Sequence, residues 1–218
     1  MNQRILTAST SALLAGAALV ACQHDVHTPF PSGLTPLEDN PLPEQMTGPY
    51  AEGLQTTSTD TDYIRVYGRG YVLVSPAVLW AAAKSPAPNI AVCSTNQQII
   101  TDNNDPNYEY AFLVHYVVNN VLTVEWDDQW RFGTVDGTPA APTLSITKHQ
   151  KTNGSSFIRL SEGTIQLAAT DDPNVSELSF VEHLDAVSAS TADVVKGMQH
   201  NYDSLVAVGH GGAVPACP

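Results

Sequence analysis

Residues 121–132, VLTVEWDDQWRF, place three carboxylates (Glu125, Asp127 and Asp128) around two tryptophans. Acids this close could work as a general acid and a general base if their side chains met over one substrate. Successive side chains of a strand, however, point to opposite faces. Apolar residues here occupy one parity and polar residues the other, which is typical of an antiparallel strand with one face in water. We therefore expect Glu125 and Asp127 on the solvated outer face.

Asp128 departs from this alternation, because it shares the inner parity of Trp126 and Trp130. Burying a carboxylate among apolar side chains is costly unless it finds a partner. Two interpretations remain open. Asp128 is either exposed to solvent at the strand end beside a bulge, or it lies at the mouth of a pocket and has a functional role.

A histidine on the preceding strand joins this inner face if the connecting turn is short. Residues 119–120 are both Asn, and a two-residue turn there pairs Trp126 with Leu113 and Val124 with His115. His115 is then inside the sheet, either satisfied by a hydroxyl or acting as a polar handle for a ligand. An odd-length loop would reverse this assignment, because neighbouring strand residues face opposite ways.

No other motif indicates a specific chemistry. His183 has acidic neighbours in FVEHLDAV, but adjacent strand residues diverge, so a metal site from this segment is geometrically poor. The GHGG run from Gly209 resembles the oxyanion loop of lipases, yet the chain has no GxSxG nucleophile elbow. The cysteines lack CxxC spacing. We therefore predict no metal, no cofactor and no catalytic residue set.

The N-terminus carries the most specific signal in the chain. Residues 1–21 combine Arg4 with an apolar run and small residues, a pattern typical of an export signal too short to be a stable membrane span. Leu19-Val20-Ala21-Cys22 resembles the bacterial lipobox, which implies that Cys22 is lipidated and begins the mature protein. The alternative is an ordinary signal with Cys22 as a plain thiol. Gln23 follows in place of Asp, which by resemblance to enterobacterial sorting favours the outer membrane. We expect an exported lipoprotein of the cell envelope, anchored by acyl chains.

The composition excludes some partners. Once Arg4 leaves with the signal, 8 basic and 22 acidic residues remain, a formal net charge of −14. Such a surface repels nucleic acid and anionic headgroups, so we expect no nucleic-acid partner. Cys93 and Cys217 are left as an even pair in an oxidising compartment, which predicts a disulfide between them. Two separate thiols are the alternative.

Composition divides the chain beyond the signal into three parts. Residues 22–61 are rich in Pro, Thr and acids without an apolar period, which predicts a flexible tether. A bound tail anchored by Tyr50 and Leu54 is the alternative. Residues 62–209 are long enough for one hydrophobic core, and residues 210–218 form a C-terminal tail.

The folded part begins with a strand and a helix, continues with six strands joined by tight turns, and closes with a long amphipathic helix. Ser75 and Pro76 mark the start of the first helix. The last helix is capped by Ser190 or Thr191 and ends at Gly209. The seven strands are expected at residues 62–74, 90–101, 108–118, 121–132, 144–151, 155–170 and 175–188.

This element order resembles the helix-grip fold of the SRPBCC superfamily, which includes START, Bet v 1 and polyketide-cyclase-like proteins. The segments VYGRGYV, TVEWDDQWRFG, FVEHL and VGHG also look like a group of deltaproteobacterial lipoproteins. The resemblance covers residues 62–209 and implies an α+β fold. In it a curved seven-stranded antiparallel sheet wraps on the long C-terminal helix, with one or two short helices after the first strand. It also implies a cavity between sheet and helix that holds an apolar molecule.

Three functional hypotheses follow, and we favour the first. The chain is a membrane-anchored binding module for a lipid-like or other hydrophobic small molecule. Alternatively it is a structural or protein-interaction lipoprotein with a packed core, or a cyclase- or hydrolase-type enzyme that uses His115 and Asp128 as acid and base. The residues expected to bind the ligand are Leu113, His115, Val124, Trp126, Trp130, Met198, Tyr202 and Leu205.

Overall fold

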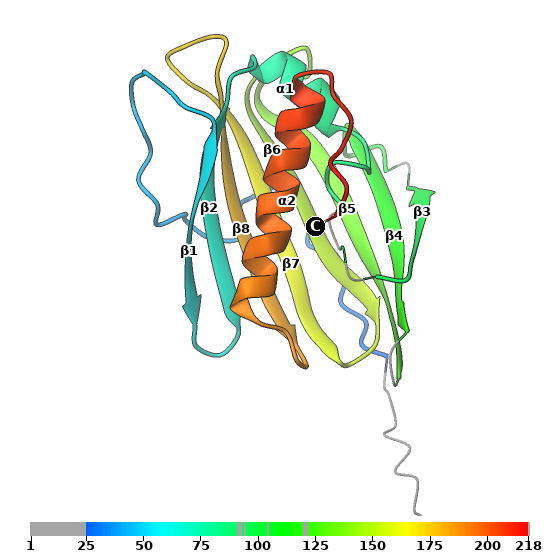
Figure 1. Ribbon diagram of the computed structural model, residues 1–218. Coiled ribbons are helices and arrows are strands. Elements are labelled where there is room, and N and C mark those ends of the chain that lie inside the picture. The colour runs from blue at the N-terminus through cyan, green and yellow to red at the C-terminus, as the bar shows by residue number, and fades with distance from the viewer. Residues whose placement is uncertain (1–24, 91–92, 94, 104, 120–121, 218) are drawn as a thin grey trace, which may run out of the picture.

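The computed structural model describes residues 25–217 except 91–92, 94, 104 and 120–121. The predicted signal peptide and Cys22 lie outside the described residues. In the described part, eight antiparallel strands form one open sheet in the order β1-β2-β8-β7-β6-β5-β4-β3. Helix α2 (Thr191–Gly209) lies across one face of this sheet, and α1 (Pro76–Ala83) packs near its C-terminal end (Figure 1). The strands are β1 (Gly53–Asp60), β2 (Ile64–Val72), β3 (Gln97–Asp102), β4 (Tyr110–Asn119), β5 (Thr123–Thr138), β6 (Ala141–Gly154), β7 (Ile158–Ala169) and β8 (Ser176–Ala186).

The predicted α+β class and the sheet-on-helix arrangement are confirmed, but the strand count is not seven. The additional strand is β1, which pairs with β2 along its whole length at the edge of the sheet. Its sequence, GLQTTSTD, is almost entirely exposed. An exposed edge strand carries no apolar period, and for this reason the sequence pattern did not reveal it.

Residues 25–52, which we call the N-terminal strap, lie along the outer face of the sheet, away from α2 (Figure 1). The Asn40 side-chain amide donates a hydrogen bond of 2.8 Å to the carbonyl oxygen of Gly68 on β2. Oε1 of Glu38 lies 2.8 Å from Nε2 of His183 on β8. Polar side chains and backbone groups of the strap and the sheet therefore help to hold the strap in place.

The flexible tether predicted over residues 22–61 is wrong for its described part, because the strap and β1 are both packed on the sheet. The alternative of a bound tail is the correct one. The ring of Tyr50 packs at a tilt against that of Tyr71, with 4.8 Å between the ring centroids, and Leu54 packs against the hydrophobic core. Segments that bind through polar groups give no periodic apolar signal, so composition alone indicated disorder.

The register of β4 against β5 also differs from the prediction. Trp126 stands opposite Tyr116, and Asp127 stands opposite His115. Three residues, 120–122, separate the two strands in place of a two-residue turn. The resulting odd shift moves the β4 side chains to the other face. His115 is therefore on the outer face, where its Nδ1 lies 2.8 Å from Oδ1 of Asp127.

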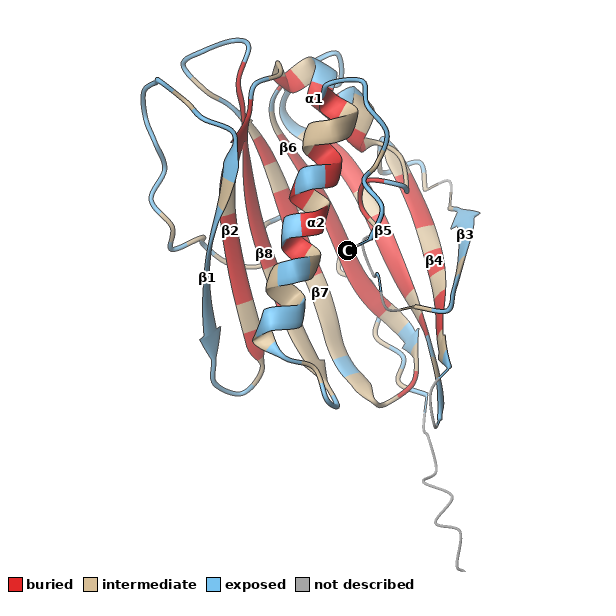
Figure 2. Cartoon of the chain, viewed as in Figure 1, coloured by how far each residue is buried: buried red, intermediate tan, exposed pale blue. Residues whose placement is uncertain are grey.

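The hydrophobic core lies between α2 and the sheet face that it covers. Figure 2 shows buried residues along this face and along the facing side of α2, whereas the edge strands β1 and β3 are exposed.

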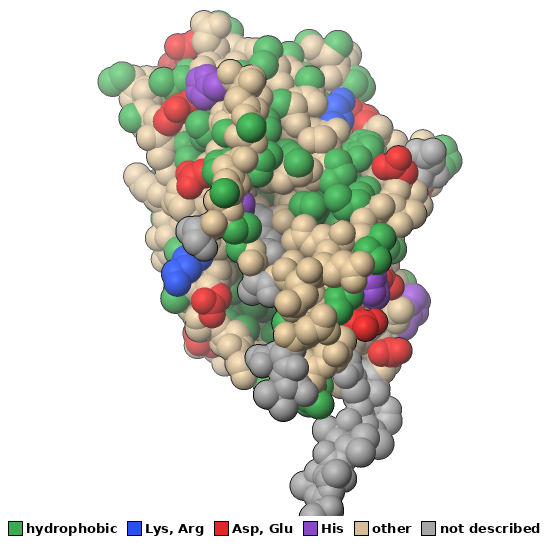
Figure 3. All heavy atoms as spheres, turned by 45° about the vertical axis from the view of Figure 1, so that its right-hand side comes forward, with side chains coloured by type: hydrophobic (Ala, Val, Ile, Leu, Met, Phe, Trp, Pro, Cys, Tyr) green, Lys and Arg blue, Asp and Glu red, His purple; other side chains and the backbone are tan. Residues whose placement is uncertain are grey.

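The Ser190 side chain accepts a hydrogen bond from the backbone N–H of Asp193 and caps α2 as predicted. On the face that Figure 3 shows, acidic side chains are more frequent than Lys and Arg, as the formal net charge of −13 leads one to expect. Neither described helix has the length and hydropathy needed to cross a membrane.

Candidate functional site

A cavity of about 690 Å³ lies between the N-terminal half of α2 and the inner face of the sheet. Its walls come from β4 to β8, from the connection between β8 and α2, and from Cys93 in the segment between α1 and β3. Val187 in the β8–α2 connection both lines the cavity and is 58 % exposed, so the cavity opens at that end of the sheet.

Four of the eight predicted ligand-binding residues line this cavity: Val124, Trp126, Trp130 and Met198. The other four do not. Leu113 and His115 are on the opposite face of the sheet because of the register shift. Leu205 and Tyr202 lie further along α2 in the packed core, and the Tyr202 hydroxyl donates a 2.6 Å hydrogen bond to the carbonyl oxygen of Tyr71.

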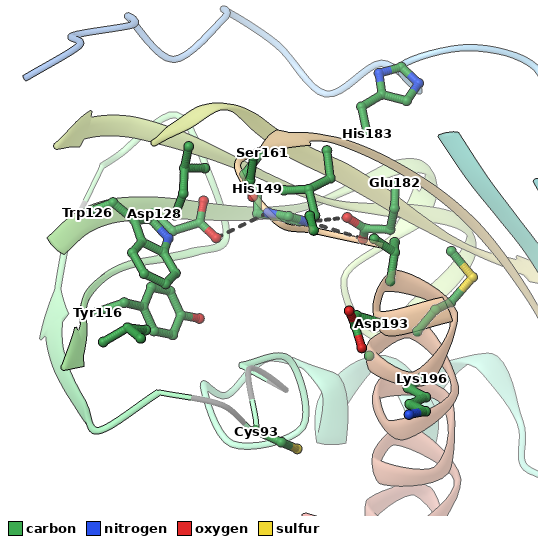
Figure 4. Close-up of a pocket in the computed structure, with 18 of the residues that line it drawn as sticks. Cys93, Tyr116, Trp126, Asp128, His149, Ser161, Glu182, His183, Asp193 and Lys196 are labelled. Atoms are coloured by element: carbon green, nitrogen blue, oxygen red, sulfur yellow. Dashed lines mark hydrogen bonds and ion pairs between the residues drawn. The ribbon is translucent and has the colours of Figure 1, made fainter. Parts of the chain in front are cut away.

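A histidine is held between two carboxylates on the sheet wall of the cavity (Figure 4). Nδ1 of His149 lies 3.2 Å from Oδ2 of Asp128, and its Nε2 lies 3.0 Å from Oε2 of Glu182. The imidazole also stacks on Trp130, with 4.3 Å between the ring centroids. These three residues, which we call the charged cluster, come from three different strands, β5, β6 and β8.

Glycine at position 163 makes the charged cluster possible. Gly163 on β7 pairs with His149 on one side and with Glu182 on the other. A Cβ at this position would lie 2.2 Å from Nε2 of His149 and 2.3 Å from Oε1 of Glu182. Only glycine therefore leaves the space in which the two side chains meet across β7.

The cluster holds His149 as an imidazolium. Burial by itself lowers the pKa of His149, but the charges of Glu182 and Asp128 outweigh it and raise the pKa well above the usual 6.5. Burial, together with the negative charges of Asp128 and Glu182, raises the pKa of Tyr116 well above 10. The cavity wall therefore carries an imidazolium at His149 and a neutral phenol at Tyr116.

Three polar atoms on this wall have no hydrogen-bond partner among the described residues. They are Oδ1 of Asp128, the hydroxyl oxygen of Tyr116 and Nε1 of Trp130. All three residues line the cavity, and each is less than a tenth exposed. Buried polar groups are normally hydrogen-bonded, so these atoms are unusual for a packed wall.

The charged cluster places fixed charges on the cavity wall and offers no free base for proton abstraction. Both ring nitrogens of His149 are already engaged by carboxylates, so neither is free to accept a proton from a substrate. The acid–base pair proposed from the sequence, His115 with Asp128, does not exist, because the two residues are on opposite faces of the sheet.

His149 and Glu182 were missed by reasoning from the sequence. A signal for Glu182 was available, because it shares the inner parity of Phe180 and Leu184 in the β8 pattern. His183, its neighbour, was considered instead, and its imidazole is bound between Glu162 on β7 and Glu38 of the strap. His149 lies in the polar run SITKHQK, which has no apolar alternation to show which face it occupies.

The predicted disulfide between Cys93 and Cys217 is present, with 5.4 Å between the Cα atoms. It ties the C-terminal tail to the segment that carries one side of the cavity. His200 lies beside it, and these three residues are the one group of potential metal ligands in the described chain. The disulfide leaves no thiolate there, and thiolate is the form of cysteine that binds metal.

No family model and no curated protein matches this chain. Among solved structures, the chain is similar to the lipid transfer and protein localization domain of human StarD13, at 10 % identity and a TM-score of 0.47, over 72 % of this chain and 82 % of that one. Human STARD10 matches at 10 % identity and a TM-score of 0.47, over 74 % of this chain and 72 % of that one. The Zhui aromatase/cyclase from Streptomyces sp. R1128 matches at 8 % identity and a TM-score of 0.44, over 72 % of this chain and 94 % of that one. These proteins belong to the groups that the sequence resembles.

Proposed function

We propose that this chain is a membrane-anchored lipoprotein whose cavity binds a hydrophobic or lipid-like small molecule. The observation that carries the proposal is the cavity of about 690 Å³ between sheet and helix. Pockets for small molecules have volumes of about 300–1,000 Å³ and mostly apolar walls. Trp126, Trp130, Val124 and Met198 supply such a wall here. A structural protein with a packed core has no reason to keep this volume empty, because protein interiors are close-packed.

The proposal includes lipidation at Cys22 and a place in the cell envelope, at the outer membrane. Its support is the sequence of residues 1–22, which combines an export signal with a lipobox-like ending, and Gln23 after the cysteine. Acyl chains suffice to hold a folded domain at a bilayer.

Titration with the neutral apolar fluorophore N-phenyl-1-naphthylamine tests for the cavity. The protein should begin at Gln23, so that the strap is kept and no lipid interferes. We expect saturable binding with a Kd of about 1 µM, which corresponds to about 8 kcal/mol. Emission of Trp126 and Trp130 should change along with the probe signal.

Gly197 offers a variant that blocks the cavity. It lines the cavity from α2, and a Cβ built there meets nothing within 4 Å. Gly197→Phe should therefore fill the cavity without straining the fold and abolish probe binding. Gln199→Phe adds the same ring to an exposed position of the same helix and should bind like the wild type. Absence of binding to the wild type, or equal binding to Gly197→Phe, would contradict the proposed cavity function.

A further inference from the structure

The cavity has a polar end with an incomplete set of hydrogen bonds. One charged acceptor, Oδ1 of Asp128, and two donors, the Tyr116 hydroxyl and the Trp130 indole N–H, have no partner among the described residues. Tyr116 stands opposite Trp126, and Asp128 stands opposite Val114, two positions along the same strand pair. In Figure 4 the side chains of Tyr116 and Asp128 occupy the same wall. They form one polar patch within an apolar cavity.

The charge of this patch restricts what it can bind. Asp128 and Glu182 carry two negative charges, and His149 supplies one positive charge between them. Lys196 is the one Lys or Arg side chain among the described lining residues, and it is exposed on α2. A carboxylate or phosphate buried against this patch would meet net negative charge in a medium of low dielectric constant, which is strongly unfavourable.

The number of donors and acceptors restricts the ligand further. An ammonium group could donate to Asp128 but offers no acceptor to Tyr116 or to Trp130. An ether or ketone could accept from one of these donors but would leave the carboxylate oxygen without a partner. A hydroxyl group does both, because it has one O–H to donate and lone pairs to accept.

We propose that the cavity selects an uncharged apolar molecule that carries a hydroxyl group, which donates to Oδ1 of Asp128 and accepts from the hydroxyl of Tyr116. This inference rests on the proposed function, because it names the ligand class of the same cavity. The apolar walls bind the body of the molecule, and the polar patch fixes its orientation with the hydroxyl at the charged cluster. A fatty acid is thereby excluded as the preferred ligand, and a long-chain or polycyclic alcohol is favoured.

Displacement of bound N-phenyl-1-naphthylamine by a series with one chain and different heads tests the inference. The probes are 1-decanol, decyl methyl ether, decanoate and decylammonium. We expect 1-decanol to bind at least about tenfold more tightly than each of the other three, because it alone both donates to the carboxylate and accepts from the phenol, and a hydrogen bond to a charged group is among the stronger ones. Equal binding of all four probes, or tighter binding of decanoate or decylammonium, would overturn the hydroxyl preference and leave the cavity function standing.

Tyr116→Phe removes the proposed donor and leaves its ring in place. The Tyr116 hydroxyl has no partner among the described residues, so the variant should be at least as stable as the wild type. We expect 1-decanol to bind about fivefold more weakly and the fluorophore to bind unchanged. Tyr110→Phe is the matched control, because Tyr110 is on the same face of β4 outside the cavity lining, and it should change neither affinity. An unchanged affinity of Tyr116→Phe for 1-decanol would refute the assignment of this residue. Failure of the fluorophore to bind the wild type would refute the cavity function and this inference together.

Discussion

Replacing Gly163 by alanine tests how much the charged cluster contributes to stability. An alanine in a strand normally stabilises by about 0.5–1 kcal/mol relative to glycine. Here the new methyl group would overlap the contact between His149 and Glu182, at 2.2 Å and 2.3 Å from their nearest atoms. His149 cannot retreat, because it stacks on Trp130 and is bonded to Asp128. The contact with Glu182 must therefore break.

Breaking a buried ion pair costs about 3–5 kcal/mol, and the lower end applies because 16 % of the Glu182 side chain is exposed. After the strand gain is subtracted, we expect Gly163→Ala to lower the free energy of unfolding by about 2–3 kcal/mol. Urea unfolding at pH 7, followed by tryptophan emission and circular dichroism with the disulfide intact, measures it. Gly197→Ala is the control with the opposite sign: its methyl group meets open space in a helix, so it should stabilise by up to about 1 kcal/mol.

A double-mutant cycle separates loss of the contact from a general effect on the strand. In a His149→Ala background the space beside Gly163 is empty and Glu182 can move into it. Gly163→Ala should then cost less than about 0.5 kcal/mol, within the usual error of additivity. If Gly163→Ala is neutral or stabilising in the wild-type background, or equally costly in both backgrounds, the described packing of His149 against Glu182 is incorrect.

Three further predictions concern pH, the disulfide and the anchor. Because the pKa of His149 is raised in the folded state, its contribution to stability is complete below pH of about 6.5 and is lost as pH rises toward the folded-state pKa, by up to about 1.4 kcal/mol per pH unit. His149→Gln should therefore reduce the dependence of the free energy of unfolding on pH, measured by urea unfolding from pH 6 to 9. An unchanged pH dependence in the variant would contradict this prediction. Cys93→Ser should lower the free energy of unfolding by about 2–4 kcal/mol, because the bond closes a loop with a sequence separation of 124, and intact mass showing two free thiols in the exported wild type would rule the bond out. Metabolic labelling with a palmitate analogue should mark the wild type and not Cys22→Ala, and label that persists on the variant would disprove lipidation at Cys22.

The sequence predicted those parts of the fold that depend on local pattern. The capping of α2 at Ser190, the alternation of β5 and the apolar stripe of α2 are each set by neighbours in the chain, and all three are found. The pairing of β4 with β5 depended on one loop, and a single additional residue there exchanged the faces and removed His115 from the cavity.

The candidate site was predicted only in part. Its apolar half is set by the local sequence pattern of one strand, whereas its charged half depends on how distant strands pair. Trp126 and Trp130 follow from the alternation of one strand. The meeting of His149 with Glu182 depends instead on the order β6-β7-β8 and on Gly163 between them, three segments whose pairing no local pattern reveals. The strap escaped prediction for a related reason, since it is bound by polar contacts to distant strands.

The packed strap has a consequence for how the protein stands on a bilayer. Asp25 already bridges to Ser155 at the turn between β6 and β7, so only three residue steps, at most about 11 Å of chain, separate it from Cys22. With Cys22 acylated as proposed, the domain is docked directly on the lipid surface and cannot rotate freely above it. The end of the sheet at this turn is also the end where the cavity opens, and it exposes Leu122 and Val187. The mouth of the cavity then faces the headgroups, and a hydrophobic guest can pass between bilayer and protein without crossing bulk water.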